Sequence, residues 1–225
     1  GVIEILSSRR EYTKINPFVV LLGKGEHQVT SSWTDEGGDV IETTLGITRS
    51  NITFVGTGKD TTTILGGFGI DNFENITFKN MTLTNTNGEG VYMSNAKVKL
   101  FDVALKGCSG VAFYVHTGSS EAILVATRCE FANNLYGAAV NGSLTSATFN
   151  NCVFHDNQYG IWANKSTIHL HGEATAIHSN RKTGITASES GKVIIHLPSN
   201  HNTSYNNGRG DRFTKNGGTI TNVED

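Results

Sequence analysis

Short stretches in which apolar and polar residues alternate recur along the middle of the chain, each directly after a glycine. The glycines are separated by 20, 27, 23 and 24 residues. They are Gly90, Gly110, Gly137, Gly160 and Gly184. Apolar residues at positions i and i+2 indicate strands with one buried face, because a helix would need a period of about 3.6 residues. The inward positions predicted from this alternation are Val91, Phe113, Val140, Ile161 and Ile185.

Two further apolar stretches separate successive glycine-led strands, for example residues 98–100 and 103–105. Each repeat therefore supplies three short strands, joined by turns rich in Asn and Gly. Three strands that return every 20–27 residues predict the coil of a solenoid, and the strands of successive coils pair in parallel about 4.8 Å apart. We expect an all-β, right-handed parallel β-helix, a single-stranded solenoid of about seven or eight coils with three short parallel sheets.

Small polar and sulfur-containing side chains recur at equivalent places in these coils. Asparagines end the second strands at similar offsets before the glycines, which predicts a ladder of stacked amides at that corner. These asparagines are Asn85, Asn134, Asn157 and Asn180. Cys129 and Cys152 lie 23 residues apart, so we expect them to stack in the core. The 3 cysteines form no zinc-binding pattern and are predicted to be free and buried.

The whole chain, residues 1–225, is predicted to form one domain. Residues 1–22 read as an N-terminal cap and first strand, with Phe18–Leu22 as the strand and Glu4–Ile15 as a short capping helix or strand. The coils then span residues 23–199. Residues 200–225 are polar, rich in Gly and Asn, and lose the repeat, so we expect a cap or tail that lies across the last coil or is partly mobile.

The charge and the distribution of apolar residues argue against two classes of partner, nucleic acids and membranes. Charged residues make up 17% of the chain and the net charge is −2, which gives no support to a nucleic-acid partner. The sequence contains neither an apolar run of 18 residues nor a basic amphipathic helix, so no membrane role is expected. No cofactor is predicted.

The repeats from about Ile47 to Leu197 resemble the parallel β-helix repeat family, within the pectate-lyase-like superfold. Residues 51–58 and 63–66 are similar to the first coils of pectin-modifying β-helices. Polysaccharide lyases on this scaffold use a calcium-binding carboxylate cluster with a basic residue, or Arg, Lys or His bases. Here one outward column holds Asp102, Arg128 and Asn151, with a single acid. The resemblance therefore implies the architecture, and we predict neither a calcium site nor a complete catalytic set.

Histidines form two predicted outward pairs on neighbouring coils, His171 with His196 and His155 with His178. Paired imidazoles can bind a metal or act as acid and base, and they also occur as polar residues on a solvated sheet. No third ligand is identified, so no metal site is predicted. His171, His196 and Arg128 are the catalytic candidates if the protein is an enzyme, either a polysaccharide lyase or an epimerase.

Aromatic and amide side chains gather on the outward face of the glycine-led strands. Flat rings stack on pyranose faces while amides bond hydroxyls, so this pattern predicts a sugar-binding platform. The candidate residues are Tyr92, Tyr114, Tyr159, Trp162, Asn141 and Asn164, with Tyr114 placed in the same column as the two asparagines. We expect a glycan or polysaccharide ligand along this sheet, with the enzyme and a protein-binding repeat scaffold as alternatives.

Overall fold

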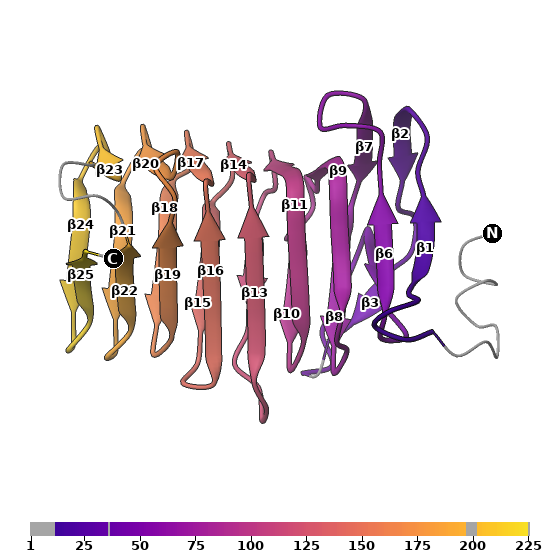
Figure 1. Ribbon diagram of the computed structural model, residues 1–225, viewed down its shortest axis with the longest axis horizontal. Coiled ribbons are helices and arrows are strands. Elements are labelled where there is room, and N and C mark those ends of the chain that lie inside the picture. Colours follow the sequence, from indigo (N-terminus) through magenta and orange to yellow (C-terminus); the bar gives the residue numbers. More distant parts are fainter. Residues whose placement is uncertain (1–11, 36, 197–201, 225) are drawn as a thin grey trace.

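A computed structural model describes residues 12–35, 37–196 and 202–224. Within these ranges the chain winds into one elongated solenoid of stacked β-strands (Figure 1). The solenoid starts at β1 (Phe18–Leu21) and β2 (Gly25–Gln28) and finishes at β24 (Gly210–Lys215) and β25 (Thr219–Val223). The described residues contain no helix long and apolar enough to span a membrane. The predicted all-β parallel solenoid is confirmed.

One face of the solenoid is an eight-stranded parallel sheet, which we call the glycine-led sheet. Each coil contributes one strand, because the chain returns to this face once per turn. In spatial order the strands are β24, β21 (Thr183–Ser188), β18 (Tyr159–Asn164), β15 (Tyr136–Asn141), β12 (Val111–Val115), β10 (Val91–Ser94), β8 (Gly67–Asp71) and β5 (Thr44–Gly46).

The other two faces join into one 15-stranded sheet, where three separate sheets were expected. They join because β9 (Ile76–Thr84) and β11 (Lys97–Lys106) continue around a corner, where Asn80 and Asp102 adopt φ angles of 56° and 52°. In later coils the same corner divides two strands. These pairs are β13 (Ala122–Thr127) with β14 (Glu130–Ala132), β16 (Thr145–Asn150) with β17 (Val153–His155), β19 (Thr167–His171) with β20 (Ala176–His178), and β22 (Lys192–His196) with β23 (Ser204–Tyr205).

Near the first coils the chain departs from the solenoid pattern. Strands β6 (Ile52–Val55) and β7 (Thr62–Leu65) pair with β1 and β2 on one side and with β9 on the other. Between β2 and β5 the chain forms an antiparallel hairpin, β3 (Trp33–Thr34) and β4 (Val40–Ile41), which the repeat pattern did not predict.

The core is a continuous apolar column inside the coils. All five predicted inward residues are confirmed as buried, with Val91, Phe113, Val140 and Ile185 fully inaccessible and Ile161 at 1% exposure. Aromatic rings stack along the column, since each coil repeats the side-chain positions of the previous one. Full burial of one such aliphatic or aromatic side chain stabilises the fold by about 1.5–3 kcal/mol, which makes this column the main source of stability.

Buried amides stack at the corner that precedes the glycine-led sheet. The side-chain N–H group of Asn134 donates to Oδ1 of Asn157 over 2.9 Å, Asn157 donates to Asn180 over 3.0 Å, and Asn180 donates to Asn207 over 2.8 Å. Each Oδ1 also accepts the backbone N–H of the preceding asparagine, at 3.0–3.1 Å. The predicted ladder is therefore present in this half of the solenoid, and Asn207 extends it by one coil.

The ladder is interrupted toward the N-terminus. Cys108 occupies the equivalent place in its coil, and its backbone N–H donates to Oδ1 of Asn134 over 2.8 Å. Asn85 is buried, but its Oδ1 accepts from Thr43 and not from another asparagine side chain of the predicted ladder. Cys129 and Cys152 are free and buried in the core, in agreement with the prediction.

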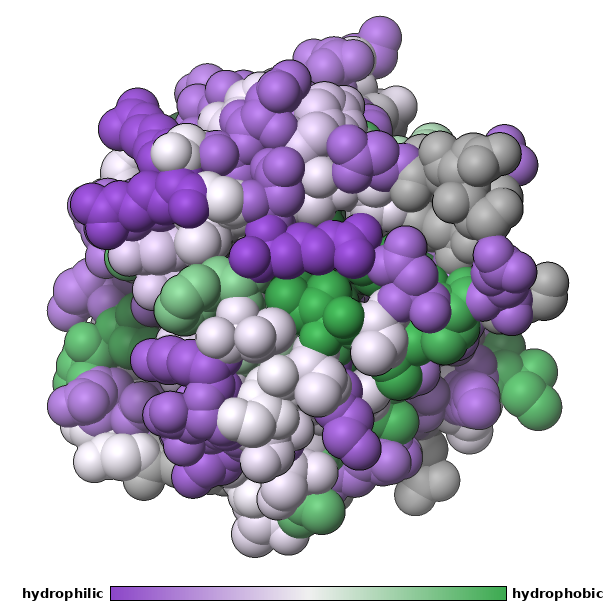
Figure 2. Space-filling model, turned by 90° about the vertical axis from the view of Figure 1, so that its left-hand side faces the viewer, coloured by the Kyte–Doolittle hydropathy of each residue, from purple (hydrophilic) through white to green (hydrophobic). Residues whose placement is uncertain are grey.

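A cap was predicted at each end of the solenoid. The predicted first strand is observed as β1, whereas most of the predicted cap at residues 4–15 lies outside the described residues. At the other end, β24 and β25 pair in parallel with β21 and β22. The polar tail therefore adds a coil to the solenoid instead of lying across it, because backbone pairing requires no apolar alternation. Hydrophobic side chains lie in the middle of this end of the molecule, bordered by hydrophilic ones (Figure 2).

Candidate functional site

One outward column of side chains runs along the glycine-led sheet. In register order it contains Gly46, Gly69, Tyr92, Tyr114, Ala139, Trp162, Thr186 and Phe213. The alignment of the glycines predicts Tyr114 in the column of Asn141, whereas the structure pairs it with Tyr92 and Ala139. The difference arises because Val91 pairs with Phe113, so this coil is shifted by two residues relative to the glycine alignment.

The N-terminal half of this column is covered by the hairpin indole. Trp33 lies so close to Gly46 and Gly69 that an added Cβ would approach its ring to 2.5 and 2.1 Å. The Trp33 ring also packs on Tyr92, with centroids 5.3 Å apart, and Tyr92 packs on Tyr114 at 5.5 Å. Tyr92 is only 9% exposed, and burial raises the pKa of Tyr114. These two predicted binding residues belong to a packed aromatic cluster rather than to an open platform.

The C-terminal half of the column is open and hollowed. A groove of about 530 Å³ lies over β15, β18, β21 and β24, and we call it the aromatic groove. It is lined by Tyr136, Tyr159, Trp162, Lys182, Thr183, Thr186, Arg209, Phe213 and Lys215. The rings of Tyr136 and Tyr159 stack at 4.5 Å and 9°, and the Trp162 ring lies 5.9 Å from Tyr136 at 30°. Phe213 is 49% exposed. Flat rings thus extend over neighbouring coils on one surface.

A chain of hydrogen bonds holds the Trp162 indole in place. Its Nε1–H donates to Oγ of Ser188 over 2.8 Å, and the Ser188 hydroxyl donates to Oδ1 of Asn164 over 3.3 Å. Asn164 in turn donates to Oδ1 of Asn141 over 3.0 Å. The two predicted asparagines therefore do not line the groove, and instead they fix the orientation of the ring that does.

Positive charge surrounds these rings. Lys182 donates from Nζ to the hydroxyl of Tyr159 over 2.9 Å and lies 4.7 Å from the centre of that ring. Arg209 and Lys215 line the same groove, and none of the described residues that line it carries a carboxylate. In a chain of net charge −2, this gathers cations on one surface and favours an anionic ligand.

Arg128, a predicted catalytic candidate, is held at the corner of the other two faces. Its guanidinium donates to both carboxylate oxygens of Asp102, over 2.8 and 2.6 Å, and this pairing lowers the pKa of Asp102. Beside it, in a hollow of about 370 Å³, His155 contacts Oε1 of Glu130 at 3.0 Å and Oδ2 of Asp156 at 2.6 Å. Arg128 is thus paired with the Asp102 carboxylate, while the His155 imidazole contacts the carboxylates of Glu130 and Asp156.

The predicted histidine pairs are neighbours in the structure. His171 pairs with His196 and His155 with His178, with ring centroids 4.1 and 5.5 Å apart. A third imidazole joins the first pair, because Nδ1 of His169 lies 3.0 Å from Nε2 of His196. Burial and the neighbouring His196 lower the pKa of His169, which favours its neutral form.

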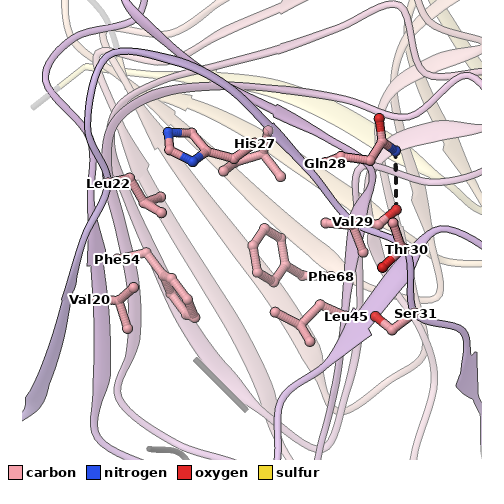
Figure 3. A pocket seen from close by; sticks show the side chains of 11 residues that line it. Val20, Leu22, His27, Gln28, Val29, Thr30, Ser31, Leu45, Phe54 and Phe68 are labelled. Atoms are coloured by element: carbon pink, nitrogen blue, oxygen red, sulfur yellow. Dashed lines mark hydrogen bonds between the residues drawn. The ribbon is translucent and has the colours of Figure 1, made fainter. Parts of the chain in front are cut away.

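At the N-terminal end of the solenoid lies a hollow of about 580 Å³, lined in part by side chains of the apolar core. Figure 3 shows the side chains that line it, with Phe54 and Phe68 on its walls. Both rings belong to the apolar core, and two polar side chains at its rim bond to the backbone, Gln28 to Leu65 O at 3.1 Å and His27 to Gly23 O at 3.0 Å. Most of the described residues that line this hollow are apolar.

Comparisons with known proteins define the class. Residues 40–174 match the family described as the right-handed β-helix region, so the chain belongs to that family. Among solved structures it is similar to the thermostable pectate lyase PL 47, with a TM-score of 0.44 and 9% sequence identity, over 99% of this chain and 76% of that one. No curated protein matches the sequence.

Several residues of these sites carried no signal in the sequence. Lys182, Arg209 and Lys215 lie in turns or in the polar tail, where outward positions show no periodicity. Phe213 is an isolated aromatic residue in that tail. His169 could have been found, because it is two residues before His171 and so faces the same side of the strand.

Proposed function

We propose that this protein binds an acidic polysaccharide, of the polyuronate class, in the aromatic groove. The observation that carries the proposal is that stacked rings and three cations line one groove, where the described lining residues include no carboxylate. Sugar rings present apolar faces to the aromatic side chains, and each uronate carries a carboxylate that Lys or Arg can pair with. The glycine-led sheet repeats coil by coil, so an extended ligand can contact equivalent positions on successive coils.

The affinity for such a ligand has two contributions, ion pairs and ring stacking. Exposed ion pairs contribute about 0–1 kcal/mol each and weaken with salt, because the Debye length is about 8 Å at physiological ionic strength. Ring stacking depends much less on salt. We therefore expect affinity for a polyuronate that decreases, but does not vanish, as salt is raised.

Isothermal titration calorimetry with polygalacturonate, and with a neutral polysaccharide of similar length, tests the proposal. Trp162→Ala and Lys182→Ala should each weaken polygalacturonate binding. Tyr205→Ala and Lys99→Ala are matched controls on other strands and should bind like the wild type, since neither residue lines the groove. Equal binding of both polymers would refute the acidic preference, and an unchanged affinity of Trp162→Ala would refute the site.

A second candidate function, a polysaccharide lyase or epimerase, is supported by one observation. Glu130 and His155 share a hollow with Lys59 and Arg128, which brings acid, base and cation together. A lyase needs a base for proton abstraction and a cation beside the uronate. Release of unsaturated uronate from polygalacturonate, lost in His155→Ala but not in Trp33→Phe, would establish this activity, and absence of product would reject the lyase.

A further inference from the structure

Three histidines gather on the 15-stranded sheet, away from the aromatic groove. His169 and His171 lie two residues apart on β19 and therefore face the same side of the strand. His196 lies on β22, directly opposite His171 in the parallel register. One ligating nitrogen of each imidazole lies within 4.8 Å of the other two, and all three residues are half-buried. We call these residues the three-histidine cluster.

From this arrangement we propose that the three-histidine cluster is a binding site for a divalent transition-metal ion of the zinc class. Imidazole nitrogen is a preferred ligand of these ions, and three histidines with a fourth position open to water form a known type of zinc site. The proposal is independent of the aromatic groove, since the two sites lie on different sheets.

Distances within the cluster agree with such a site. Zinc–nitrogen bonds of about 2.0–2.1 Å in a tetrahedral arrangement place the nitrogens about 3.3 Å apart. Nδ1 of His169 and Nε2 of His196 are already 3.0 Å apart. No separation exceeds 4.8 Å, so each must shrink by at most about 1.5 Å, which rotation about side-chain torsions provides. His171 and His196 are stacked at 11°, so one of these rings must turn for both lone pairs to converge.

Metal binding by three neutral imidazoles requires no net loss of protons. Each neutral imidazole has one lone pair and one N–H, and the short contact between His169 and His196 requires one nitrogen to donate and the other to accept. When the metal binds, the donating ring shifts its proton to its other nitrogen, and the freed lone pair joins the metal. No proton leaves a neutral cluster, and no oxidant or reductant is needed.

Among the described residues, the strand neighbours of the three-histidine cluster carry no charge. In the adjacent coil Asn150 lies opposite His171 and Thr148 opposite His169, and both are neutral. On the other side β25 places Thr221 and Val223 opposite Ile194 and His196. The strand register holds the three Cα positions rigidly, so only side-chain torsions must adjust, and such preorganisation limits the entropy cost of binding.

Calorimetric titration of the chelator-treated protein with Zn²⁺ tests the proposal. We expect one Zn²⁺ per chain, and His169→Ala and His196→Gln should each weaken the affinity by about 100-fold or more, beyond the 10–100-fold typical of residues that only support a ligand. The matched control is His178→Ala, because His178 belongs to the other stacked pair. Circular dichroism establishes that each variant is folded.

Co²⁺ provides a second readout, since a tetrahedral Co²⁺ site has characteristic visible absorption. We expect this absorption in the wild type and in His178→Ala, and its loss in His196→Gln. Equal Zn²⁺ affinity in the wild type and in both cluster variants, or loss of binding in His178→Ala alone, would overturn the proposal.

Discussion

The amide of Asn157 provides the sharpest test of how the solenoid is held together. This side chain is fully buried and makes four hydrogen bonds. Its Oδ1 accepts the backbone N–H and the side-chain N–H of Asn134, at 3.0 and 2.9 Å. Its Nδ2 donates to Phe131 O and to Oδ1 of Asn180, both over 3.0 Å. Asn157→Ala removes all four bonds and leaves the Asn134 backbone N–H without this acceptor.

The size of the effect follows from these contacts. One buried unsatisfied group costs about 1–3 kcal/mol, and each further lost hydrogen bond about 0.5–1.5 kcal/mol. Because the neighbours relax in part, we expect the free energy of unfolding to fall by about 3 kcal/mol. Asn141→Ala is the matched control, because Asn141 is only half-buried and accepts a hydrogen bond from Asn164 on the outer face of the glycine-led sheet. Its loss should cost about 1 kcal/mol or less.

Urea denaturation followed by circular dichroism measures this difference. Hydrogen exchange adds local resolution, because the stability of a solenoid is distributed along its repeats. Faster exchange in Asn157→Ala should be centred on residues 131–134 and 154–157. If Asn157→Ala and Asn141→Ala were equally stable, the buried ladder would not be the support that we describe.

Three further predictions concern single side chains. Burial raises the pKa of Cys108 to about 11, so alkylation at about pH 8 should be slow in the folded protein and fast in denaturant; fast alkylation of the folded protein would contradict its burial. The lowered pKa of Asp102 means that its pair with Arg128 stabilises the fold at neutral pH and loses this effect as the pH falls below the ordinary pKa of 3.8. The melting temperatures of wild type and Asp102→Asn should therefore converge in acid, and a constant difference would count against the pair. Ser188→Ala removes the acceptor of the Trp162 indole, so polyuronate affinity should weaken about fivefold, and an unchanged Kd would show that the ring needs no such support.

Much of the fold could be predicted because the inward positions of each strand must hold apolar residues that fill the core. Val91, Ile161 and Ile185 are each followed two positions later by another buried apolar residue, and a strand with one buried face requires this period. The alignment failed at Tyr114, since the turn before its strand changes length and the glycine no longer marks the register. The tail at residues 210–223 was missed because its strands pair through the backbone with little apolar alternation, although Ile220 packs against the core.

The sites were less predictable, since outward positions obey no packing rule. Trp162 and Tyr159 were predicted from their residue type and do line the aromatic groove. Tyr92 is also an aromatic residue at a predicted outward position, but Trp33 covers it. This contact joins segments that are far apart in the sequence. Lys182 could not be assigned to the groove without the coil-to-coil register, which sets it beside Tyr159.

The central claim, that the aromatic groove binds an acidic glycan, is tested most directly by tryptophan fluorescence. The chain has 2 tryptophans, Trp33 in the hairpin and Trp162 in the groove. In Trp33→Phe all tryptophan emission comes from Trp162, and in Trp162→Phe it comes from Trp33. We predict that an oligogalacturonide changes the emission of Trp33→Phe in a saturable manner and leaves that of Trp162→Phe unchanged. No change in Trp33→Phe, or an equal change in both variants, would contradict the account.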